Sequence, residues 1–256
     1  MRNLLDNKGV NRIFLVIPCA GSGSRAGGNK AKQYQEIRGL PMIMHTLGAM
    51  LEIEEIVHCL LVVSPTDHEI EHLLEKHISH SKSFARLSVE KIGGDTRSES
   101  VLAGLKAIRH WGAQEDDWVL VHDAARCLVQ SNWVQKLIDE CRHDEVGGIL
   151  AWPLSDTLKQ SLGGRIEQTL ERQNKWLAQT PQMFKLGPLI QAIEAAPGFM
   201  TDESSAMEAQ GFAPKLVQAS ALNIKVTYAD DFLWADAWLA AKSLASADQT
   251  KERPST

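Results

Sequence analysis

The stretch Ile13-Phe-Leu-Val-Ile-Pro-Cys-Ala-Gly-Ser-Gly-Ser-Arg25 joins a continuous apolar run to a glycine-rich segment. The run from Ile13 to Pro18 is typical of a strand buried on both faces of a parallel sheet. A glycine-rich turn directly after such a strand lets backbone N–H groups approach a phosphate chain closely, because glycine has no side chain in the way. On its own, the segment fits an ordinary glycine turn with exposed cations equally well.

Apolar runs of this kind alternate with amphipathic segments along most of the chain. The predicted strands are Ile13–Pro18, Val57–Ser64, Leu87–Ile92, Trp118–Asp123 and Gly148–Pro153. The predicted helices between them are Leu40–Leu51, Asp67–Ile78, a segment that starts with the capping box Thr96–Glu99, and a segment behind a Ser131 cap. This alternation predicts an α/β fold with a mainly parallel, Rossmann-like sheet, helices on both faces, and ligands at the carboxyl ends of the strands.

The segment from about 154 to 179 interrupts this alternation. Two short β-type runs flank Gly163-Gly164, which is a hairpin signal, so we expect a β-arm that projects from the sheet. The elements expected after the arm are helices at Leu186–Ala196 and Thr201–Gln210, strands around Lys215–Val217 and Asn223–Thr227, and a last helix at Asp230–Ala245. We therefore expect one domain over residues 13–245, an N-terminal tail at 1–12 and a polar tail at 246–256.

Composition narrows the class of protein. The 256 residues are 44% hydrophobic, as in a folded globular chain, and 27 Lys and Arg against 32 Asp and Glu leave a net charge of −5. This balance argues against nucleic acid or a membrane surface as the partner. The four cysteines form no C-x-x-C pair, and the first apolar run is too short for a signal peptide or a membrane span. We expect a cytoplasmic protein with reduced thiols.

Three glycine or histidine motifs indicate other kinds of site, and each fails on its surroundings. Gly21-x-Gly23-x-x-Ala26 satisfies a loose dinucleotide fingerprint, but the next predicted strand ends in Ser64-Pro65 without the required acidic residue. Gly23-x-x-x-x-Gly28 is followed by Asn29, so it is not a Walker loop. In the H-E-x-x-H motif at 68–72, both histidines oppose the apolar stripe of their helix and lack a third ligand, which favours a solvated face over zinc.

Charged residues stand where the predicted fold places ligands. Arg25 and Lys32 put two cations beside the glycine loop, which suits a triphosphate better than a dinucleotide. Asp123 and Arg126 follow a buried strand, where an Asp commonly holds a magnesium ion that bridges phosphates, or where the two side chains form a structural ion pair. Lys225 falls in a late predicted strand, and spacing alone favours a solvent-facing side chain over one that reaches the pocket.

Seven motifs then occur in one order along the chain: Pro18–Arg25, Lys32–Tyr34, Gly93–Gly104, His122–Arg126, Asp156–Lys159, Thr201–Glu203 and Asn223–Thr227. As a set, spread over about residues 13 to 240, they resemble the 2-C-methyl-D-erythritol 4-phosphate cytidylyltransferase family of the non-mevalonate isoprenoid pathway. The resemblance implies a nucleotidyltransferase sheet and an enzyme that joins CTP to methylerythritol phosphate, with magnesium, and releases pyrophosphate.

The resemblance also implies roles for single residues. Transition-state stabilisers fall on Arg25 and Lys32. Residues that position the substrate phosphate fall on Arg172 and Lys225, and Asp123 matches an acidic residue near the metal and the nucleotide. The matches that line the pockets are Ala20, Gly21, Gly23, Gly94, Asp95 and Ser100 for cytidine, and Arg126 and Thr157 for methylerythritol phosphate. The arm would pair two subunits in a homodimer, so that Arg172 serves the neighbouring site.

The chemistry agrees with these residues. A phosphate monoester is already anionic near neutral pH, so its attack on the α-phosphorus of CTP needs no general base. The difficulty is to bring one anion onto another, and fixed cations stabilise the negative charge that builds up there. Cys19, Ala26 and Ala31 depart from the family pattern, and none of them removes a charged group. Three alternatives stay open: a ribitol-5-phosphate cytidylyltransferase, a dinucleotide-binding oxidoreductase and a non-catalytic nucleotide sensor.

Overall fold

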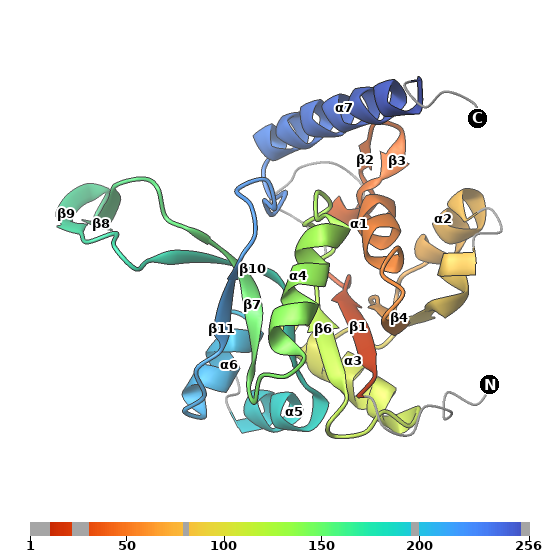
Figure 1. The fold of residues 1–256 in the computed structure, drawn as a ribbon, viewed down its shortest axis with the longest axis horizontal. Coiled ribbons are helices and arrows are strands. Elements are labelled where there is room, and N and C mark those ends of the chain that lie inside the picture. The colour runs from red at the N-terminus through yellow and green to blue at the C-terminus, as the bar shows by residue number, and fades with distance from the viewer. Residues whose placement is uncertain (1–10, 22–30, 79–81, 196–199, 252–256) are drawn as a thin grey trace.

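The computed structural model describes residues 11–21, 31–78, 82–195 and 200–251. Within these residues, the main sheet has the strand order β11-β7-β10-β6-β1-β4-β5 (Figure 1). Parallel pairing joins β6 (Trp118–Val121), β1 (Ile13–Pro18), β4 (Ile56–Val62) and β5 (Leu87–Glu90). β10 (Trp176–Lys185) runs antiparallel between β6 and β7 (Gly147–Pro153), and β11 (Lys215–Gln218) pairs parallel with β7. The predicted mainly parallel sheet is confirmed.

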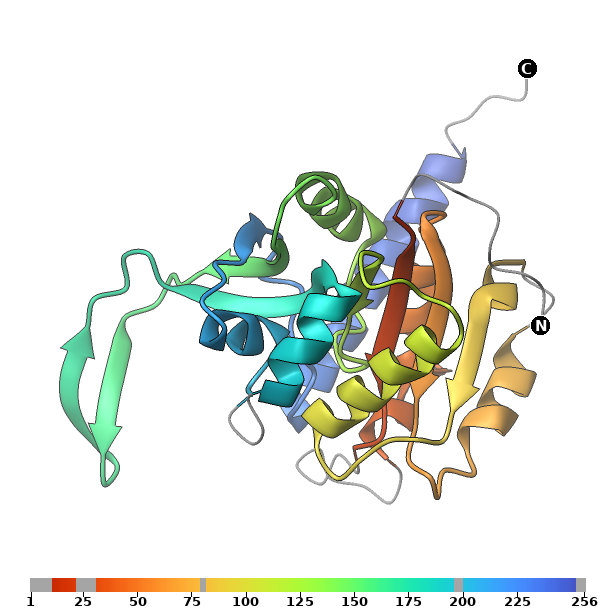
Figure 2. The ribbon, with the colours of Figure 1, turned by 90° about the horizontal axis from the view of Figure 1, so that it is seen from below.

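Alternate side chains of β1 enter two separate cores, because successive side chains of a strand point to opposite faces. Ile13, Leu15 and Ile17 pack on one face with α1 (Met42–Leu51), α2 (Ile70–His77) and α4 (Ser131–Cys141). Phe14 and Val16 pack on the other face with α3 (Arg97–His110), α5 (Leu186–Ala195) and α6 (Glu203–Ala209). In Figure 2, α4 (green) and α5 (cyan) lie on opposite sides of the sheet. The prediction of helices on both faces is confirmed.

Short elements gather at the carboxyl ends of the central strands. They are the 3-10 turn η2 (Lys32–Tyr34), the strand pair β2 (Glu36–Ile37) and β3 (Leu40–Pro41), and the last helix α7 (Ala229–Lys251). A second 3-10 turn, η3 (Lys82–Arg86), precedes β5. A small apolar cluster with Ile37, Leu128 and Ala235 attaches α7 to this end of the sheet. Of these elements, η2 lines the cavity above β1 and β6 with Lys32 and Gln33.

The predicted arm is present as an antiparallel hairpin of β8 (Leu158–Leu162) and β9 (Arg165–Leu170). Gly163 and Gly164 have φ angles of 58° and 77°, the left-handed region that a two-residue hairpin turn requires. Figures 1 and 2 both show the hairpin projecting away from the sheet. Leu162 and Ile166 on the hairpin are 74% and 68% exposed, so the arm carries apolar side chains on its surface.

Three local predictions are wrong. The last helix does not end at Ala245 but continues to Lys251, into the segment 246–256 predicted as a polar tail. Residues 223–227 do not form a strand, because the Asn223 amide donates to the Thr180 carbonyl oxygen at 2.9 Å and the segment crosses the strand ends instead of pairing along one. Ser131 is not a helix cap, since it is already the first residue of α4 and Gln130 takes the cap position without a side-chain hydrogen bond. The predicted capping box before α3 is confirmed at Thr96 and Glu99.

Candidate active site

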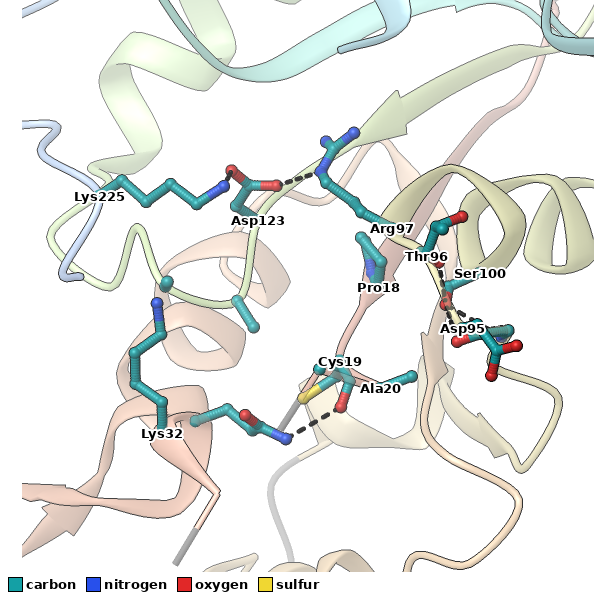
Figure 3. Close-up of a pocket in the computed structure, with 15 residues that line it drawn as sticks. Pro18, Cys19, Ala20, Lys32, Asp95, Thr96, Arg97, Ser100, Asp123 and Lys225 are labelled. Carbon is teal, nitrogen blue, oxygen red and sulfur yellow. Dashed lines mark hydrogen bonds and ion pairs between the residues drawn. The ribbon is translucent and has the colours of Figure 1, made fainter. Parts of the chain in front are cut away.

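A cavity of about 240 Å³ opens at the carboxyl ends of β1 and β6 (Figure 3). The predicted site residues that line it are Ala20, Gly21, Lys32, Gly94, Asp95, Ser100, Asp123 and Lys225. They come from segments far apart in the sequence, and the sheet edge brings them together as the topology predicted. Lys225 lines this cavity, so the solvent-facing side chain that its spacing favoured is a wrong prediction.

Other predicted residues lie elsewhere. Gly23 and Arg25 are outside the described residues. Arg126 lines an adjoining cavity. Thr157 and Arg172 belong to the arm region, where the Arg172 guanidinium donates to the Ser155 carbonyl oxygen; neither lines the cavity above β1 and β6. One copy of the chain therefore does not bring these two residues to the site.

The histidines at 68 and 72 are exposed, and His68 precedes α2 instead of lying on it. Among the residues that the structure describes, no group of three or more His, Cys, Asp or Glu could hold a metal ion. Both histidines are thus exposed to solvent, as predicted, although the prediction that His68 lies on the helix is wrong.

The turn η2 places Lys32. Its neighbour Gln33 is buried and donates its amide to the Cys19 carbonyl oxygen at 3.0 Å, which attaches η2 to the end of β1. The Lys32 ammonium donates to the Val226 carbonyl oxygen at 2.8 Å. The ammonium is thus held at the cavity by a backbone group of the same segment that carries Lys225.

The start of α3 forms the opposite wall. Thr96 caps the helix, and the Ser100 hydroxyl accepts from the Gly94 N–H at 3.1 Å and donates to the Thr96 carbonyl oxygen at 3.0 Å. Glycine is required before the cap, because a Cβ on Gly93 would lie 2.3 Å from the Ala20 Cβ. The loop after β1 and the start of α3 therefore approach each other closely, with backbone groups facing the cavity.

Asp123 lies between two cations, as Figure 3 shows. Its Oδ1 accepts from the Arg97 Nε at 2.7 Å, and its Oδ2 accepts from the Lys225 Nζ at 2.8 Å. Burial alone would raise the pKa of this carboxyl, but Arg97 and Lys225 more than offset it and hold the pKa well below its usual range. Asp123 is therefore ionised at neutral pH.

A buried chain of hydrogen bonds fixes the backbone at Asp123. The Asp123 N–H donates to the Thr180 Oγ1 at 3.0 Å, so the Thr180 hydroxyl can donate to the His122 Nδ1, 3.0 Å away. The His122 Nε2 then carries the proton and donates to the Arg126 carbonyl oxygen at 3.3 Å. Burial lowers the pKa of His122 to about 4, which keeps the ring neutral as this chain requires.

A second cavity, also of about 240 Å³, adjoins the first and shares Arg97, Asp123 and Lys225 with it. Arg126 belongs to this cavity, with its guanidinium held by the carbonyl oxygens of Asn223 at 2.6 Å and Ala178 at 3.1 Å. Two adjoining cavities with a common charged wall can hold two anionic molecules side by side.

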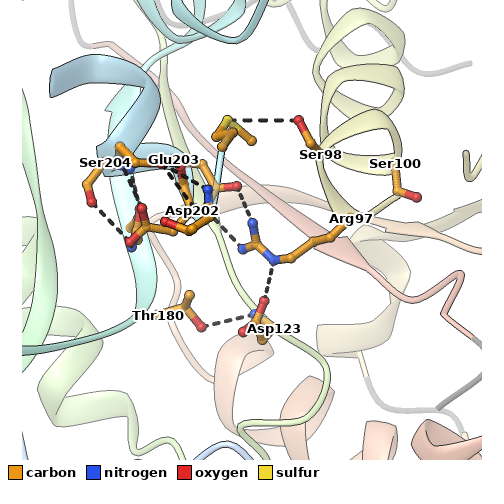
Figure 4. A network of polar contacts seen from close by, with 12 residues as sticks. Arg97, Ser98, Ser100, Asp123, Thr180, Asp202, Glu203 and Ser204 are labelled. Carbon is orange, nitrogen blue, oxygen red and sulfur yellow. Dashed lines mark hydrogen bonds and ion pairs between the residues drawn. The ribbon is translucent and has the colours of Figure 1, made fainter. Parts of the chain in front are cut away.

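Sequence reasoning gave no role to Arg97 or Glu203, although both lie in the motifs quoted above. In the structure the Arg97 guanidinium bridges Asp123 and Glu203 (Figure 4), with distances of 2.7 and 3.0 Å to the two Glu203 carboxylate oxygens. The sequence did show that a charged residue follows each of two predicted helix starts, Arg97 after Thr96 and Glu203 after Asp202. It could not show that these two residues, 106 positions apart, are in contact.

Comparison with known proteins gives one consistent result. A family model described as 2-C-methyl-D-erythritol 4-phosphate cytidylyltransferase (IspD) matches residues 13–241. A bifunctional enzyme IspD/IspF of Albidiferax ferrireducens is 51% identical over 232 residues, 91% of this chain and 54% of that protein, so the chain spans about half of that relative. A 2-C-methyl-D-erythritol 4-phosphate cytidylyltransferase of Paraburkholderia phytofirmans is 43% identical over 246 residues, 93% of this chain and 100% of that protein.

Solved structures agree with the sequence relatives. A crystal structure of 4-diphosphocytidyl-2C-methyl-D-erythritol synthase matches with a TM-score of 0.78 at 36% identity, covering 90% of this chain and 98% of that chain. The IspD structure from Francisella tularensis matches with a TM-score of 0.74 at 31% identity, covering 88% of this chain and 99% of that chain.

Among the described helices, none has the length and apolar character that a membrane crossing requires.

Proposed function

Since the chain belongs to the 2-C-methyl-D-erythritol 4-phosphate cytidylyltransferase family, we infer that it transfers the cytidylyl group of CTP to 2-C-methyl-D-erythritol 4-phosphate. The products are 4-diphosphocytidyl-2-C-methyl-D-erythritol and pyrophosphate, and the step belongs to non-mevalonate isoprenoid biosynthesis. The observation that carries this function is the pair of adjoining cavities with Arg97, Asp123 and Lys225 in their common wall. A reaction between two phosphorylated molecules needs such a pair.

The cavity above β1 and β6 would hold CTP. Backbone groups of the loop at Ala20 and Gly21 and of Gly94 face it, together with the short polar side chains of Asp95 and Ser100. Backbone donors and acceptors can recognise the edge of a cytosine by hydrogen bonding. This arrangement supports CTP as the nucleotide.

Cations would carry the catalysis. The attacking phosphate oxygen of the second substrate is already anionic, so the chain needs to align it with the α-phosphorus and to stabilise the charge that develops there. Lys32 is held at the CTP cavity by its bond to Val226, and it would stabilise that charge together with Arg25. Lys225, in the common wall, would position the attacking phosphate.

Two further residues would come from a second copy. Thr157 and Arg172 lie in the arm region away from both cavities, and the arm carries the exposed apolar side chains of Leu162 and Ile166. A homodimer that pairs through the arms would cover this surface and could bring Arg172 to the neighbouring methylerythritol phosphate cavity. Sedimentation velocity tests the pairing: removal of the apolar side chains by Leu162→Ser and Ile166→Ser should yield a monomer, and an unchanged dimer would exclude it.

Magnesium is the metal we propose. In phosphate-transfer sites Mg²⁺ commonly takes one or two carboxylates with phosphate oxygens and waters. Asp123 fits that need, because it presents one ionised carboxylate in the common wall of the two cavities. When bound there, the ion neutralises charge on the triphosphate. Chelation by EDTA should stop pyrophosphate release, and turnover that persists in EDTA would exclude the metal.

The cytoplasm is the compartment we propose. The four cysteines, Cys19, Cys59, Cys127 and Cys141, are all free and buried. Free thiols are usual in reducing compartments, and this supports the proposal.

Pyrophosphate release from CTP tests the function. The purified chain should release pyrophosphate when both CTP and methylerythritol phosphate are present, and it should not do so with either one alone. A chain that binds CTP but releases no pyrophosphate would instead be a nucleotide sensor.

A further inference from the structure

Arg97 stands at the centre of the charged wall between the two cavities. It is the first residue of α3, directly after the Thr96 cap, and its side chain is 25% exposed. The Nε donates to Asp123 at 2.7 Å, while the two terminal nitrogens donate to the carboxylate oxygens of Glu203 at 2.7 and 3.0 Å. One guanidinium thus joins α3, the loop after β6 and the start of α6 (Figure 4).

Glu203 differs from the other charged residues of the cluster, because it lines neither cavity and its side chain is 0% exposed. It meets Arg97 in a two-bond geometry, which fixes the plane of the guanidinium as well as its place. Lys could not replace Arg97 here, because an ammonium cannot direct one donor to Asp123 and a parallel pair to Glu203. The orientation of Arg97 therefore depends on a residue that substrate does not reach.

Asp123 depends in turn on Arg97. Its Oδ1 accepts from the Arg97 Nε, while its Oδ2 faces the Lys225 ammonium at 2.8 Å and the Arg126 Nε at 3.9 Å, so Arg97 fixes the rotation of the carboxylate that holds Lys225. Lys225 is 44% exposed and extends from a segment without regular structure. A long, half-exposed side chain has many rotamers, and Asp123 restricts them.

We propose that Glu203 and Arg97 are positioning residues for cytidylyl transfer, which orient Asp123 and through it Lys225 at the junction of the two cavities. The proposal rests on the proposed function, because it assigns these residues to that reaction. It makes Glu203 important for turnover although Glu203 contacts no substrate.

The test is steady-state pyrophosphate release by Glu203→Gln, with CTP and methylerythritol phosphate varied in turn. Misplacement of a positioning group by about 1 Å costs on the order of 100-fold in turnover, so we expect kcat to fall by about that factor. KM for CTP should change by less than about 3-fold, because the nucleotide contacts remain. Arg97→Lys keeps the positive charge but loses the bond geometry of the guanidinium, so its kcat should fall in the same way as that of Glu203→Gln.

A double variant separates positioning from simple stabilisation. Glu203→Gln alone leaves the buried end of the Arg97 guanidinium without its carboxylate, whereas removing both partners avoids this, and Asp123 still faces Lys225 at 2.8 Å and Arg126 at 3.9 Å when Arg97 is replaced. Arg97→Met with Glu203→Gln should therefore regain much of the Tm that Glu203→Gln alone loses, while kcat stays low because Asp123 is no longer oriented. Arg12→Met is the matched control, since it breaks a similar bridge of 2.5 Å to Asp117 at the other end of β6. It should lower Tm and leave kcat unchanged.

Wild-type turnover separates the two claims. If the wild-type chain releases no pyrophosphate, the proposed function fails and the positioning roles fail with it. If the wild type is active and Glu203→Gln keeps its kcat, or if the double variant regains kcat along with Tm, the positioning roles are wrong and the function stands. Low kcat in folded Glu203→Gln, with normal KM for CTP and a normal Arg12→Met control, supports the proposal.

Discussion

Gly104 lets α3 pack tightly against the sheet, and an added methyl group there should separate them. A Cβ on Gly104 would lie 2.8 Å from the Val16 Cγ1 and 2.8 Å from the Val62 Cγ2. Both valines are fully buried, and their branched side chains have little freedom to rotate away. Gly48 in α1 is the matched control, because a Cβ there has no heavy atom of the described residues within 4 Å.

The two substitutions share their effect on the helix and differ in packing. Each Gly→Ala change favours the helix by about 1 kcal/mol, whereas overpacking a tight core costs about 1–3 kcal/mol. Gly48→Ala should therefore raise the free energy of unfolding by about 1 kcal/mol. The free energy of unfolding of Gly104→Ala should be lower than that of Gly48→Ala by roughly 1–3 kcal/mol. Urea denaturation followed by circular dichroism measures both.

Activity should follow the same difference. A shift of α3 away from β1 and β4 also moves Arg97 away from Asp123, so Gly104→Ala should lose turnover while Gly48→Ala keeps it. If Gly104→Ala is as stable and as active as Gly48→Ala, α3 is not held against the sheet as described, and its role in placing the charged wall is wrong.

Three further substitutions test the site and the pH dependence. Lys32→Ala should lower kcat by about 100-fold or more with CTP affinity less affected, because its main contact forms in the transition state; an effect confined to KM would contradict that role. Gly93→Ala should raise KM for CTP, since its Cβ would meet Ala20 at 2.3 Å and the Val63 carbonyl oxygen at 2.8 Å; an unchanged KM would mean that this loop does not bind the nucleotide. Burial lowers the pKa of His58 below its unfolded value of 6.5, so the unfolded chain binds more protons and the folded state loses stability as the pH falls through 6.5. Denaturation at several pH values should show a smaller loss for His58→Gln, and an equal loss would exclude His58 as the cause.

Most of the fold could be predicted from patterns among neighbouring residues. Continuous apolar runs and the Thr96 capping box predicted the strands and α3, because burial on both faces and a satisfied helix start depend on neighbouring residues. Polar and apolar residues alternate over 223–227 as in a strand. In the structure, however, the Val226 N–H donates to the Ala125 carbonyl oxygen in the loop after β6, and the Asn223 amide donates to the Thr180 carbonyl oxygen of β10. A competing tertiary hydrogen bond of this kind leaves no mark in local periodicity.

The candidate site was predictable in its chemistry more than in its contacts. The topology places the ends of β1 and β6 together, so residues such as Lys32 and Asp123 could be assigned to one edge of the sheet. The Arg97–Glu203 bridge and the contact of Lys225 with Asp123 depend on side-chain directions across distant segments. No sequence pattern specifies those directions.

A substrate panel tests the central claim most directly. CTP and the other nucleoside triphosphates would each be combined with methylerythritol phosphate and with ribitol 5-phosphate, and pyrophosphate and the nucleotide product would be measured. We expect 4-diphosphocytidyl-2-C-methyl-D-erythritol from CTP with methylerythritol phosphate and much slower turnover in every other combination. Faster turnover of ribitol 5-phosphate, or equal use of another triphosphate, would contradict the assignment.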